Sequence, residues 1–402
     1  MQGAMSWAAI CGSFVLYACS SSRNLGAELG NPGGGGGGGG ACTASDDHAS
    51  DSKNCGSCGH DCLGGACNVG QCEPVALWTT PGSIGSKMGH PVPPLFVDDT
   101  FVYWVHATDE DTCSPPSLVR VAKSAPAGAS PEVVFPGGVG DVAVYGGYVY
   151  FGDFGCGDPG DHTVSRFLAD DAATPVATAV GTFDKGALGL AADSHGLFVL
   201  DVTADTTPDF TAEITALPLT GGSRMTLTAD QMPADGLLAD GTRVYWGAAG
   251  STSILSMADD GGAPTTLVSS DDVGGGQVML AVVDGTSVYY AVNSTSGATL
   301  HQLPVGETGR GTTLYDAPGG ALLVTAGYLG DTRAVISGDD VCFGVFDDHA
   351  SIVCAPKVGG PARVIVDADA GIRLDAMAAD DRSIFWIESD GDVSGTIYRL
   401  AK

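Results

Sequence analysis

Basic residues are scarce in this chain of 402 residues. Lys and Arg together number 17, whereas Asp and Glu number 47, so the net charge at pH 7 is −30. A surface this acidic repels the phosphates of nucleic acids and the headgroups of anionic lipids. We therefore expect no nucleic-acid partner, and we expect any attachment to a membrane to be covalent.

The sequence also lacks the short motifs of several enzyme classes. It contains no His-Glu-x-x-His zinc motif, no Gly-x-Ser-x-Gly nucleophile turn and no Walker loop for phosphate. Its glycine-rich stretches at 137–140 and 274–276 precede predicted strands, so no helix N-terminus is available there to bind phosphate. These absences favour a binding module over an enzyme.

The apolar run near the N-terminus, Trp7 to Ala18, is only 12 residues long. This is too short to span a bilayer and suits the core of a signal peptide, which we place at 1–18. The run ends in Leu16-Tyr17-Ala18-Cys19, which resembles the lipobox of bacterial lipoproteins, although no Lys or Arg precedes it. The resemblance implies that Cys19 is lipidated; an ordinary secretory signal is the alternative.

The segment 19–41 has no periodic apolar pattern and contains eight consecutive glycines, Gly33 to Gly40. A chain of this composition cannot bury enough apolar surface to fold. It behaves as a flexible coil with a root-mean-square reach of roughly 25 Å. We interpret it as a tether between the lipidated Cys19 and a folded part of the protein.

Apart from Cys11 and Cys19, ten cysteines remain, and six of them fall within 42–73: Cys42, Cys55, Cys58, Cys62, Cys67 and Cys72. The pair Cys55 and Cys58, with His60 nearby, leaves zinc as an alternative. The even count, the expected export and the lack of apolar side chains favour disulfides, whose 15 possible connectivities the sequence does not distinguish. The pattern NCGxCGxxC resembles Cys-rich segments that follow the signal in secreted proteins of myxobacteria and their relatives.

Strand cores with aromatic residues recur along the rest of the chain. They are FVYW at 101–104, YVYF at 148–151, LFVL at 197–200, RVYW at 243–246, SVYY at 287–290, DVCF at 340–343 and SIFW at 383–386. Successive copies are 47, 49, 46, 44, 53 and 43 residues apart. A period of this size, with four strand-like segments in each repeat, predicts the blades of a β-propeller.

The seventh repeat ends after its third strand, and an unassigned strand-like segment, Pro74 to Thr80, precedes the first repeat. If this segment completes the last blade, the ring closes without a free edge. We therefore predict an all-β chain with a seven-bladed propeller over 74–402, with a different blade count or an open array of strands as alternatives. The 53-residue spacing indicates an extra segment between 321 and 329.

The repeats resemble the VYW-type propeller repeats of bacterial surface lipoproteins. Their paired aromatic residues, such as Tyr245 and Trp246, are expected to pack between blades rather than to bind a ligand. Two further disulfides are predicted in the propeller. Cys342 and Cys354 lie on successive strands, and Cys113 and Cys156 lie in equivalent loops of the first two repeats.

Three histidines next to acidic residues are the candidates for catalysis. His106, His162 and His349 all fall in the predicted loops between second and third strands, on one face of the ring. Solvated loop residues are the alternative. Acidic turns such as Asp259-Asp260 carry the oxygens that calcium prefers, but none matches an EF-hand loop. We expect no cofactor, with structural calcium as an alternative.

Together these features predict an exported, lipid-anchored binding or scaffold protein of the cell envelope, in the outer membrane or secreted. Its partner would be an envelope or extracellular protein or a glycan. The longer acidic loops around Cys113 and Cys156 are the predicted working surface. The alternative function is an exported hydrolase or lyase with its site in the loops between second and third strands. A propeller fold does not choose between the two.

Overall fold

The computed structural model describes residues 48–80, 95–106, 117–153, 162–169, 176–183, 187–206, 209–231, 233–248, 250, 252–323, 334–369, 372–389 and 395–402. The predicted signal, the tether and Cys19, Cys42, Cys113 and Cys156 lie outside these residues. The chain divides into two compact units, 1–41 and 42–402, and only the second is described here. No described helix has the length and apolar character needed to cross a membrane.

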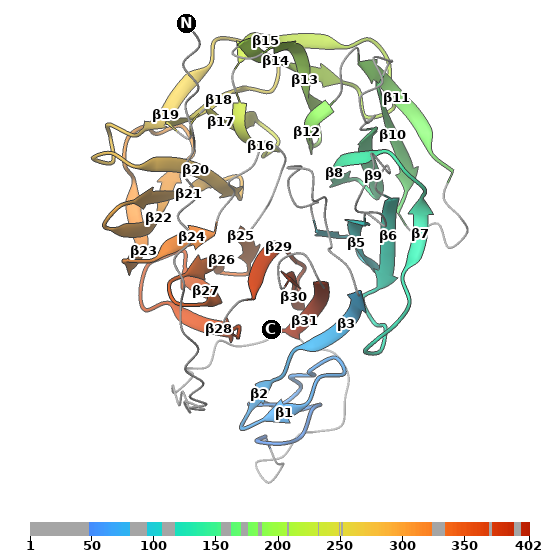
Figure 1. Ribbon diagram of the computed structural model, residues 1–402, viewed down its shortest axis with the longest axis vertical. Coiled ribbons are helices and arrows are strands. Elements are labelled where there is room, and N and C mark those ends of the chain that lie inside the picture. The colour runs from blue at the N-terminus through green and yellow to red at the C-terminus, as the bar shows by residue number, and fades with distance from the viewer. Residues whose placement is uncertain are drawn as a thin grey trace, which may run out of the picture. The chain divides into compact units, whose positions relative to one another are not determined.

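Residues 95–402 and one earlier strand form seven antiparallel blades around a central axis (Figure 1). From first to fourth strand, blade 1 consists of β4 (Phe96–Val97), β5 (Phe101–His106), β6 (Ser117–Ala122) and β7 (Glu132–Phe135), and blade 2 consists of β8 (Val139–Tyr145), β9 (Tyr148–Asp153), β10 (His162–Leu168) and β11 (Thr178–Phe183). Blade 3 consists of β12 (Ala187–Ala192), β13 (Leu197–Thr206), β14 (Asp209–Leu217) and β15 (Met225–Gln231). The prediction of a seven-bladed propeller is confirmed.

Blades 4 to 7 continue the pattern. Blade 4 consists of β16 (Pro233–Ala239), β17 (Arg243–Ala248), β18 (Ser253–Ala258) and β19 (Thr265–Ser269), and blade 5 consists of β20 (Gln277–Val283), β21 (Ser287–Ser294), β22 (Gly297–Pro304) and β23 (Thr312–Pro318). Blade 6 consists of β24 (Ala321–Leu323) with β25 (Ala334–Ser337), followed by β26 (Asp340–Phe346), β27 (Ala350–Pro356) and β28 (Arg363–Asp367). Blade 7 consists of β29 (Arg373–Ala379), β30 (Ser383–Ser389), β31 (Gly395–Ala401) and β3 (Val75–Thr80). From blade 2 round to blade 1, the first strands of successive blades contact one another around the axis.

The ring is closed by β3, which pairs antiparallel with β31 from Val75 opposite Arg399 to Thr80 opposite Gly395. The sequence segment before the first blade is therefore the fourth strand of blade 7, as its pattern predicted. Leu77 is completely buried, in a cluster with residues of blades 7 and 1. Hydrogen bonding to β3 removes the open edge that β31 would otherwise present.

Blade 6 differs from the others because its first strand is in two pieces. Both β24 and β25 pair with the same second strand, β26: Ala321 lies opposite Phe346, and Ala334 lies opposite Phe343. Leu323 and Ala334 pair with Gly344 and Phe343, which are adjacent on β26, although ten residues separate Leu323 from Ala334 in the sequence, so the sequence has an insertion at this point. This insertion accounts for the long spacing before the sixth aromatic repeat.

The apolar core is divided into wedges between blades. Seven clusters of buried side chains occur among the described residues, and each joins two neighbouring blades. Successive residues of a strand point to opposite faces of the sheet. Thus Tyr245 packs in the wedge with blade 5 and Trp246 packs in the wedge with blade 3, and both are buried. The predicted packing role of these aromatic pairs is confirmed.

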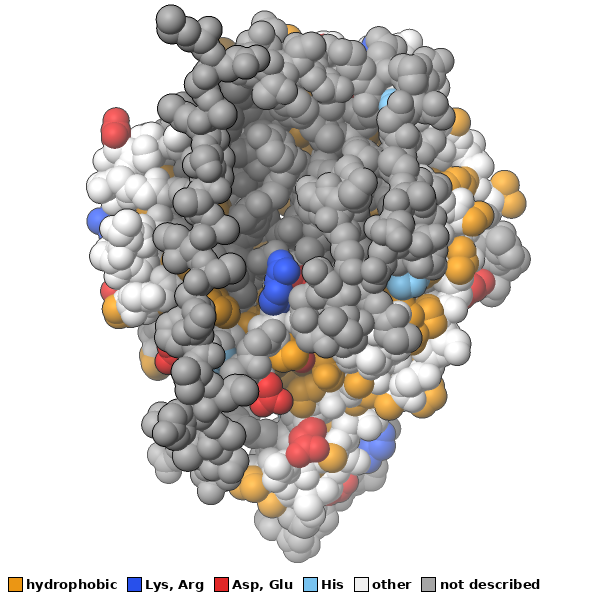
Figure 2. Space-filling model, in the orientation of Figure 1, with side chains coloured by type: hydrophobic (Ala, Val, Ile, Leu, Met, Phe, Trp, Pro, Cys, Tyr) orange, Lys and Arg blue, Asp and Glu red, His pale blue; other side chains and the backbone are white. Residues whose placement is uncertain are grey.

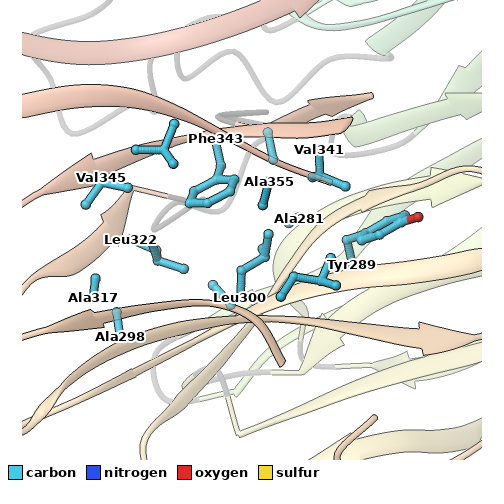
Figure 3. Close-up of a cluster of buried hydrophobic side chains, with 14 of the residues drawn as sticks. Ala281, Tyr289, Ala298, Leu300, Ala317, Leu322, Val341, Phe343, Val345 and Ala355 are labelled. Atoms are coloured by element: carbon cyan, nitrogen blue, oxygen red, sulfur yellow. The ribbon is translucent and has the colours of Figure 1, made fainter. Parts of the chain in front are cut away.

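The wedge between blades 5 and 6 shows this packing in detail (Figure 3). Tyr289 and Ala281 of blade 5 face Phe343 and Ala355 of blade 6, and all four are buried. Leu322, on the short strand β24, points into the same cluster. The two-piece first strand of blade 6 therefore still contributes to the core.

Residues 48–73, which we call the neck, form a small disulfide-bonded segment that contains β1 (Cys67–Asn68) and β2 (Gln71–Cys72). Its bonds are Cys55–Cys67 and Cys62–Cys72, and Cys58 is disulfide-bonded as well. Cys55, Cys62 and Cys72 lie close together, but their sulfurs are all in disulfides and offer no thiolate for a metal. Within 48–73 the expected disulfides are confirmed.

The neck is attached to blade 7. The buried guanidinium of Arg399, on β31, donates a hydrogen bond to the carbonyl oxygen of Leu63. Cys72 packs against the cluster in the wedge between blades 6 and 7. In blade 6 itself, Cys342 and Cys354 lie directly opposite each other on β26 and β27 and form the predicted disulfide.

Candidate functional site

The antiparallel order of the strands gives the ring two faces. The turns between first and second strands, such as the turn at Asp240, lie on one face, which we call the turn face. The connections between second and third strands lie on the opposite face, which we call the loop face. The three histidines selected from the sequence belong to the loop-face ends of their blades.

His106 is the last residue of β5 rather than a loop residue, and it is half-buried. Its ring makes an edge-to-face contact with Trp78, with 5.2 Å between the ring centroids. Burial lowers the pKa of His106 below its ordinary value. Its environment is thus that of a packed side chain at the junction of blades 1 and 7.

His162 and His349 have other surroundings. His162 is the first residue of β10 and pairs with Phe183 in blade 2, so it is also in a strand rather than a loop. His349 lies in the turn between β26 and β27 of blade 6, where its Nε2 contacts the carboxylate of Asp367 and its Nδ1 lies 3.8 Å from Asp347. Each histidine belongs to a different blade and has its own partners.

Glu388 is a further carboxyl at the loop-face end of blade 7. Its Oε1 accepts a hydrogen bond of 2.8 Å from Nε1 of Trp386. Burial raises the pKa of Glu388 above its ordinary value, and the negative charge of Asp369 adds to the shift. On the face seen in Figure 2, the charged side chains of the described residues are scattered rather than gathered into one patch.

The turn face has a repeated arrangement that the sequence reading did not identify. In five blades an aspartate begins the turn between first and second strands: Asp98, Asp193, Asp240, Asp284 and Asp380. In each, Oδ1 accepts hydrogen bonds from the backbone N–H groups two and three residues later. This is the Asx-turn geometry that favours Asp at such positions.

The second carboxylate oxygen of these aspartates binds a tyrosine where the repeat carries one. Tyr103, Tyr245 and Tyr289 donate to Asp98, Asp240 and Asp284 over 2.6, 2.5 and 3.0 Å. Burial and the neighbouring carboxylate raise the pKa of Tyr289 to about 12. The tyrosine of the aromatic motif therefore does two things: its ring packs between blades, and its hydroxyl holds the aspartate of the turn in its own blade.

Replacing Tyr245 by Phe tests this contact. Burial opposes ionisation of Asp240, but the hydrogen bonds from Tyr245 and Thr242 outweigh it and hold the pKa of Asp240 below its ordinary value. Because a hydrogen bond to a charged group is removed, we expect Tyr245→Phe to lower the free energy of unfolding by about 1–3 kcal/mol, measured by urea denaturation. In an Asp240→Ala background the same substitution should cost much less; equal costs in both backgrounds would contradict the contact.

The same aspartates also join neighbouring blades. At two junctions the residue after the third strand is a lysine that reaches the aspartate in the turn of the preceding blade. Nζ of Lys123 in blade 1 lies 2.5 Å from Oδ2 of Asp380 in blade 7, and Nζ of Lys357 in blade 6 lies 2.9 Å from Oδ2 of Asp284 in blade 5. Burial opposes ionisation of Asp284, but Lys357 and the turn hydroxyl and N–H groups lower its pKa to about 2.

The junction of blades 3 and 4 has different residues. Asp259 occupies the position that Lys123 and Lys357 occupy in their blades, and it faces Asp193 and His195 in the turn of blade 3. One donor atom from each of these three residues lies within 4.8 Å of the other two. The sequence carries a signal for this cluster. The third strands of blades 1 and 6 are followed by a lysine, whereas the third strand of blade 4 is followed by an aspartate.

Two buried groups elsewhere have strongly shifted pKa values. Asp141 on β8 is 5% exposed and accepts hydrogen bonds from the N–H of Val142 and from the N–H of Leu190 in blade 3. Burial raises its pKa to about 7. His301 on β22 is fully buried and stacked on Tyr290, and burial lowers its pKa to about 4.

The fold and its junctions define a closed seven-bladed β-propeller. No protein-family model matches the sequence, and no curated protein matches it. Among solved structures, the chain is similar to the β-propeller domain of the Trilobed protease from Pyrococcus furiosus, with a TM-score of 0.53 and 8% identity over 76% of this chain and 94% of that domain. That domain has an open velcro topology, whereas β3 closes the ring here.

The chain is also similar to puromycin hydrolase, with a TM-score of 0.54 and 15% identity over 82% of this chain and 55% of that one. An acylaminoacyl peptidase of Pyrococcus horikoshii gives a TM-score of 0.53 and 10% identity, over 80% of this chain and 53% of that one. The chain thus spans about half the length of these two enzymes. At such low identity, the similarity concerns the propeller fold alone.

Proposed function

We propose that this chain is an exported, lipid-anchored protein of the cell envelope whose propeller binds a protein or glycan partner without catalysing a reaction. The observation that carries the proposal is the oxidised, disulfide-bonded neck, which is joined to the ring through Arg399 and β3. Disulfides of this density are typical of proteins that fold in an oxidising compartment outside the cytosol. They are consistent with export directed by the segment at 1–18.

The lipid anchor at Cys19 is supported by the motif Leu16-Tyr17-Ala18-Cys19 and by the glycine-rich segment that follows it. Labelling of expressing bacteria with radioactive palmitate is expected to mark the full chain. The label should be lost in Cys19→Ser and retained in Cys11→Ser, because Cys11 lies inside the same apolar run. Equal labelling of the two variants, or no label in the unmodified chain, would contradict the anchor.

The loop face is the side on which we place the binding surface. Between β5 and β6 the connection carries Asp109, Glu110 and Asp111, whereas the corresponding connection between β26 and β27 is three residues long. Binding to arrayed glycans and to purified envelope proteins is the measurement. Exchange of these three acidic residues for their amides should change binding, while exchange of Asp260 and Asp339 on the turn face should not.

A further inference from the structure

We propose that Asp193, His195 and Asp259 form a binding site for a divalent transition-metal ion, which bridges blades 3 and 4. Asp193 and His195 lie in the turn between β12 and β13, and Asp259 lies directly after β18. Nδ1 of His195 is 2.8 Å from Oδ2 of Asp259 and 4.0 Å from Oδ1 of Asp193. This inference is independent of the proposed function.

Two other junctions show a cation at the position of Asp259. At the junctions of blades 7 with 1 and 5 with 6, a lysine ammonium lies against the aspartate of the preceding turn. At the junction of blades 3 and 4, Asp259 stands where these two junctions have the lysine, so a second carboxylate lies there in place of an ammonium group. A bound divalent cation supplies the positive charge that the lysine supplies at those two junctions.

The carboxylate groups of this cluster are oriented by their surroundings, as is usual for metal ligands. Oδ1 of Asp193 is held by the N–H groups of His195 and Gly196, and its Oδ2 is held by the N–H of Gly241 in blade 4. Such outer contacts fix the orientation of metal-binding carboxylates. Oδ2 of Asp259 is buried and accepts no well-aligned hydrogen bond, and its polar contact is with Nδ1 of His195, 2.8 Å away. A metal ion would satisfy that oxygen.

The chemistry of the set selects the kind of ion. One imidazole nitrogen with two carboxylate oxygens suits zinc and its first-row neighbours, whereas calcium prefers a shell made of oxygens. The side chain of His195 is 60% exposed, so water can complete the coordination of the ion. The side chains of Asp193 and Asp259 are only 6% and 11% exposed, which anchors the ion between the blades.

The test uses the full chain, oxidised and without an affinity tag, with zinc as the probe. Isothermal titration is expected to show one zinc ion per chain, and the melting temperature is expected to rise by several degrees and to fall again with EDTA. The same concentration of calcium should have no effect. Because loss of an outer contact alone costs about 10–100-fold in metal affinity, His195→Ala is expected to weaken zinc binding at least about 100-fold.

Asp259→Lys separates metal binding from general destabilisation. It introduces the lysine found at the junctions of blades 7 with 1 and 5 with 6, so the variant should lose zinc binding while its melting temperature without metal stays equal or rises. Asp260→Lys makes the same charge change at an exposed neighbour and should bind zinc as the unmodified chain does.

Equal zinc affinity in the unmodified chain and in Asp259→Lys would overturn the proposal. A melting temperature that depends on His195 and Asp259 but not on zinc would mean that the two residues form only an ion pair, which also overturns it. If Asp259→Lys does not fold, the exposed substitution His195→Ala decides the outcome.

Discussion

Removal of residues 1–80, which deletes the neck and β3, is expected to abolish cooperative unfolding of the ring. The deletion leaves the N–H and C=O groups of β31 unpaired along one edge. It also removes Leu77 and Val75 from the wedge between blades 7 and 1. A buried leucine alone contributes about 2–5 kcal/mol, and a domain has only about 5–15 kcal/mol in all. Thermal unfolding followed by circular dichroism, with size-exclusion chromatography, measures the effect.

Two shorter deletions separate the contributions. Removal of residues 1–47 leaves the neck and β3 in place and should preserve the sharp unfolding transition. Removal of residues 1–73 deletes the neck but keeps β3, and it should lower the melting temperature only modestly through the loss of the contact between Arg399 and Leu63. A chain without residues 1–80 that unfolds as sharply as the chain without 1–47 would show that β3 is not required for closure.

The second large effect concerns Asp141 and pH. Its pKa is raised from the ordinary value of 3.8 to about 7, so between pH 4 and 7 the folded chain holds a proton that the unfolded chain has released. Stability from this group is therefore fully present below about pH 4 and is lost as the pH rises through about 7. A shift of about three units corresponds to roughly 4 kcal/mol.

Asp141→Asn should remove this pH dependence. The variant cannot ionise. The two carboxyl oxygens of Asp141 accept hydrogen bonds from the N–H groups of Val142 and Leu190, and in the variant the amide N–H₂ group replaces one of these acceptors. We expect a loss of about 1–3 kcal/mol at pH 5 and a smaller difference at pH 8, measured by urea denaturation across the pH range. Asp348→Asn, at an exposed turn position, is the matched control. A difference that stays constant with pH would contradict a raised pKa for Asp141.

Most of the architecture was accessible from the sequence because propeller repeats are local. Each four-stranded blade is built from one continuous stretch, so the spacing of motifs such as RVYW at 243–246 reports the blade count directly. The sequence has one unassigned strand before the first blade and lacks the fourth strand of the last blade. These two observations together predicted the pairing of β3 with β31. The extra segment in blade 6 was placed between 321 and 329 from the spacing, but the pairing of two pieces, β24 and β25, with the same strand β26 was not predicted, since a spacing does not say what the extra residues do.

The contacts between blades were less accessible. Lys123 and Asp380 are 257 residues apart, and no local pattern indicates that they pair. In the segment 42–73, six cysteines left 15 connectivities open, and the bonds Cys55–Cys67 and Cys62–Cys72 depend on the folded geometry. The histidines were selected by their acidic neighbours in the sequence. His195 also has one, Asp193, two residues before it, but its second carboxylate, Asp259, comes from the next blade and no local pattern indicates that approach.

The second strands place alternate buried side chains in the two wedges beside each blade, and this has a consequence for how disturbances spread. In a linear repeat protein the terminal repeats have one neighbour each and unfold first. Here blade 7 contacts blade 1 as well as blade 6, so every blade has two partners and the array has no end at which fraying can begin. The least stable wedge therefore sets the resistance of the whole ring to unfolding. A substitution in blade 4 affects the packing of blades 3 and 5 at the same time, through Trp246 and Tyr245.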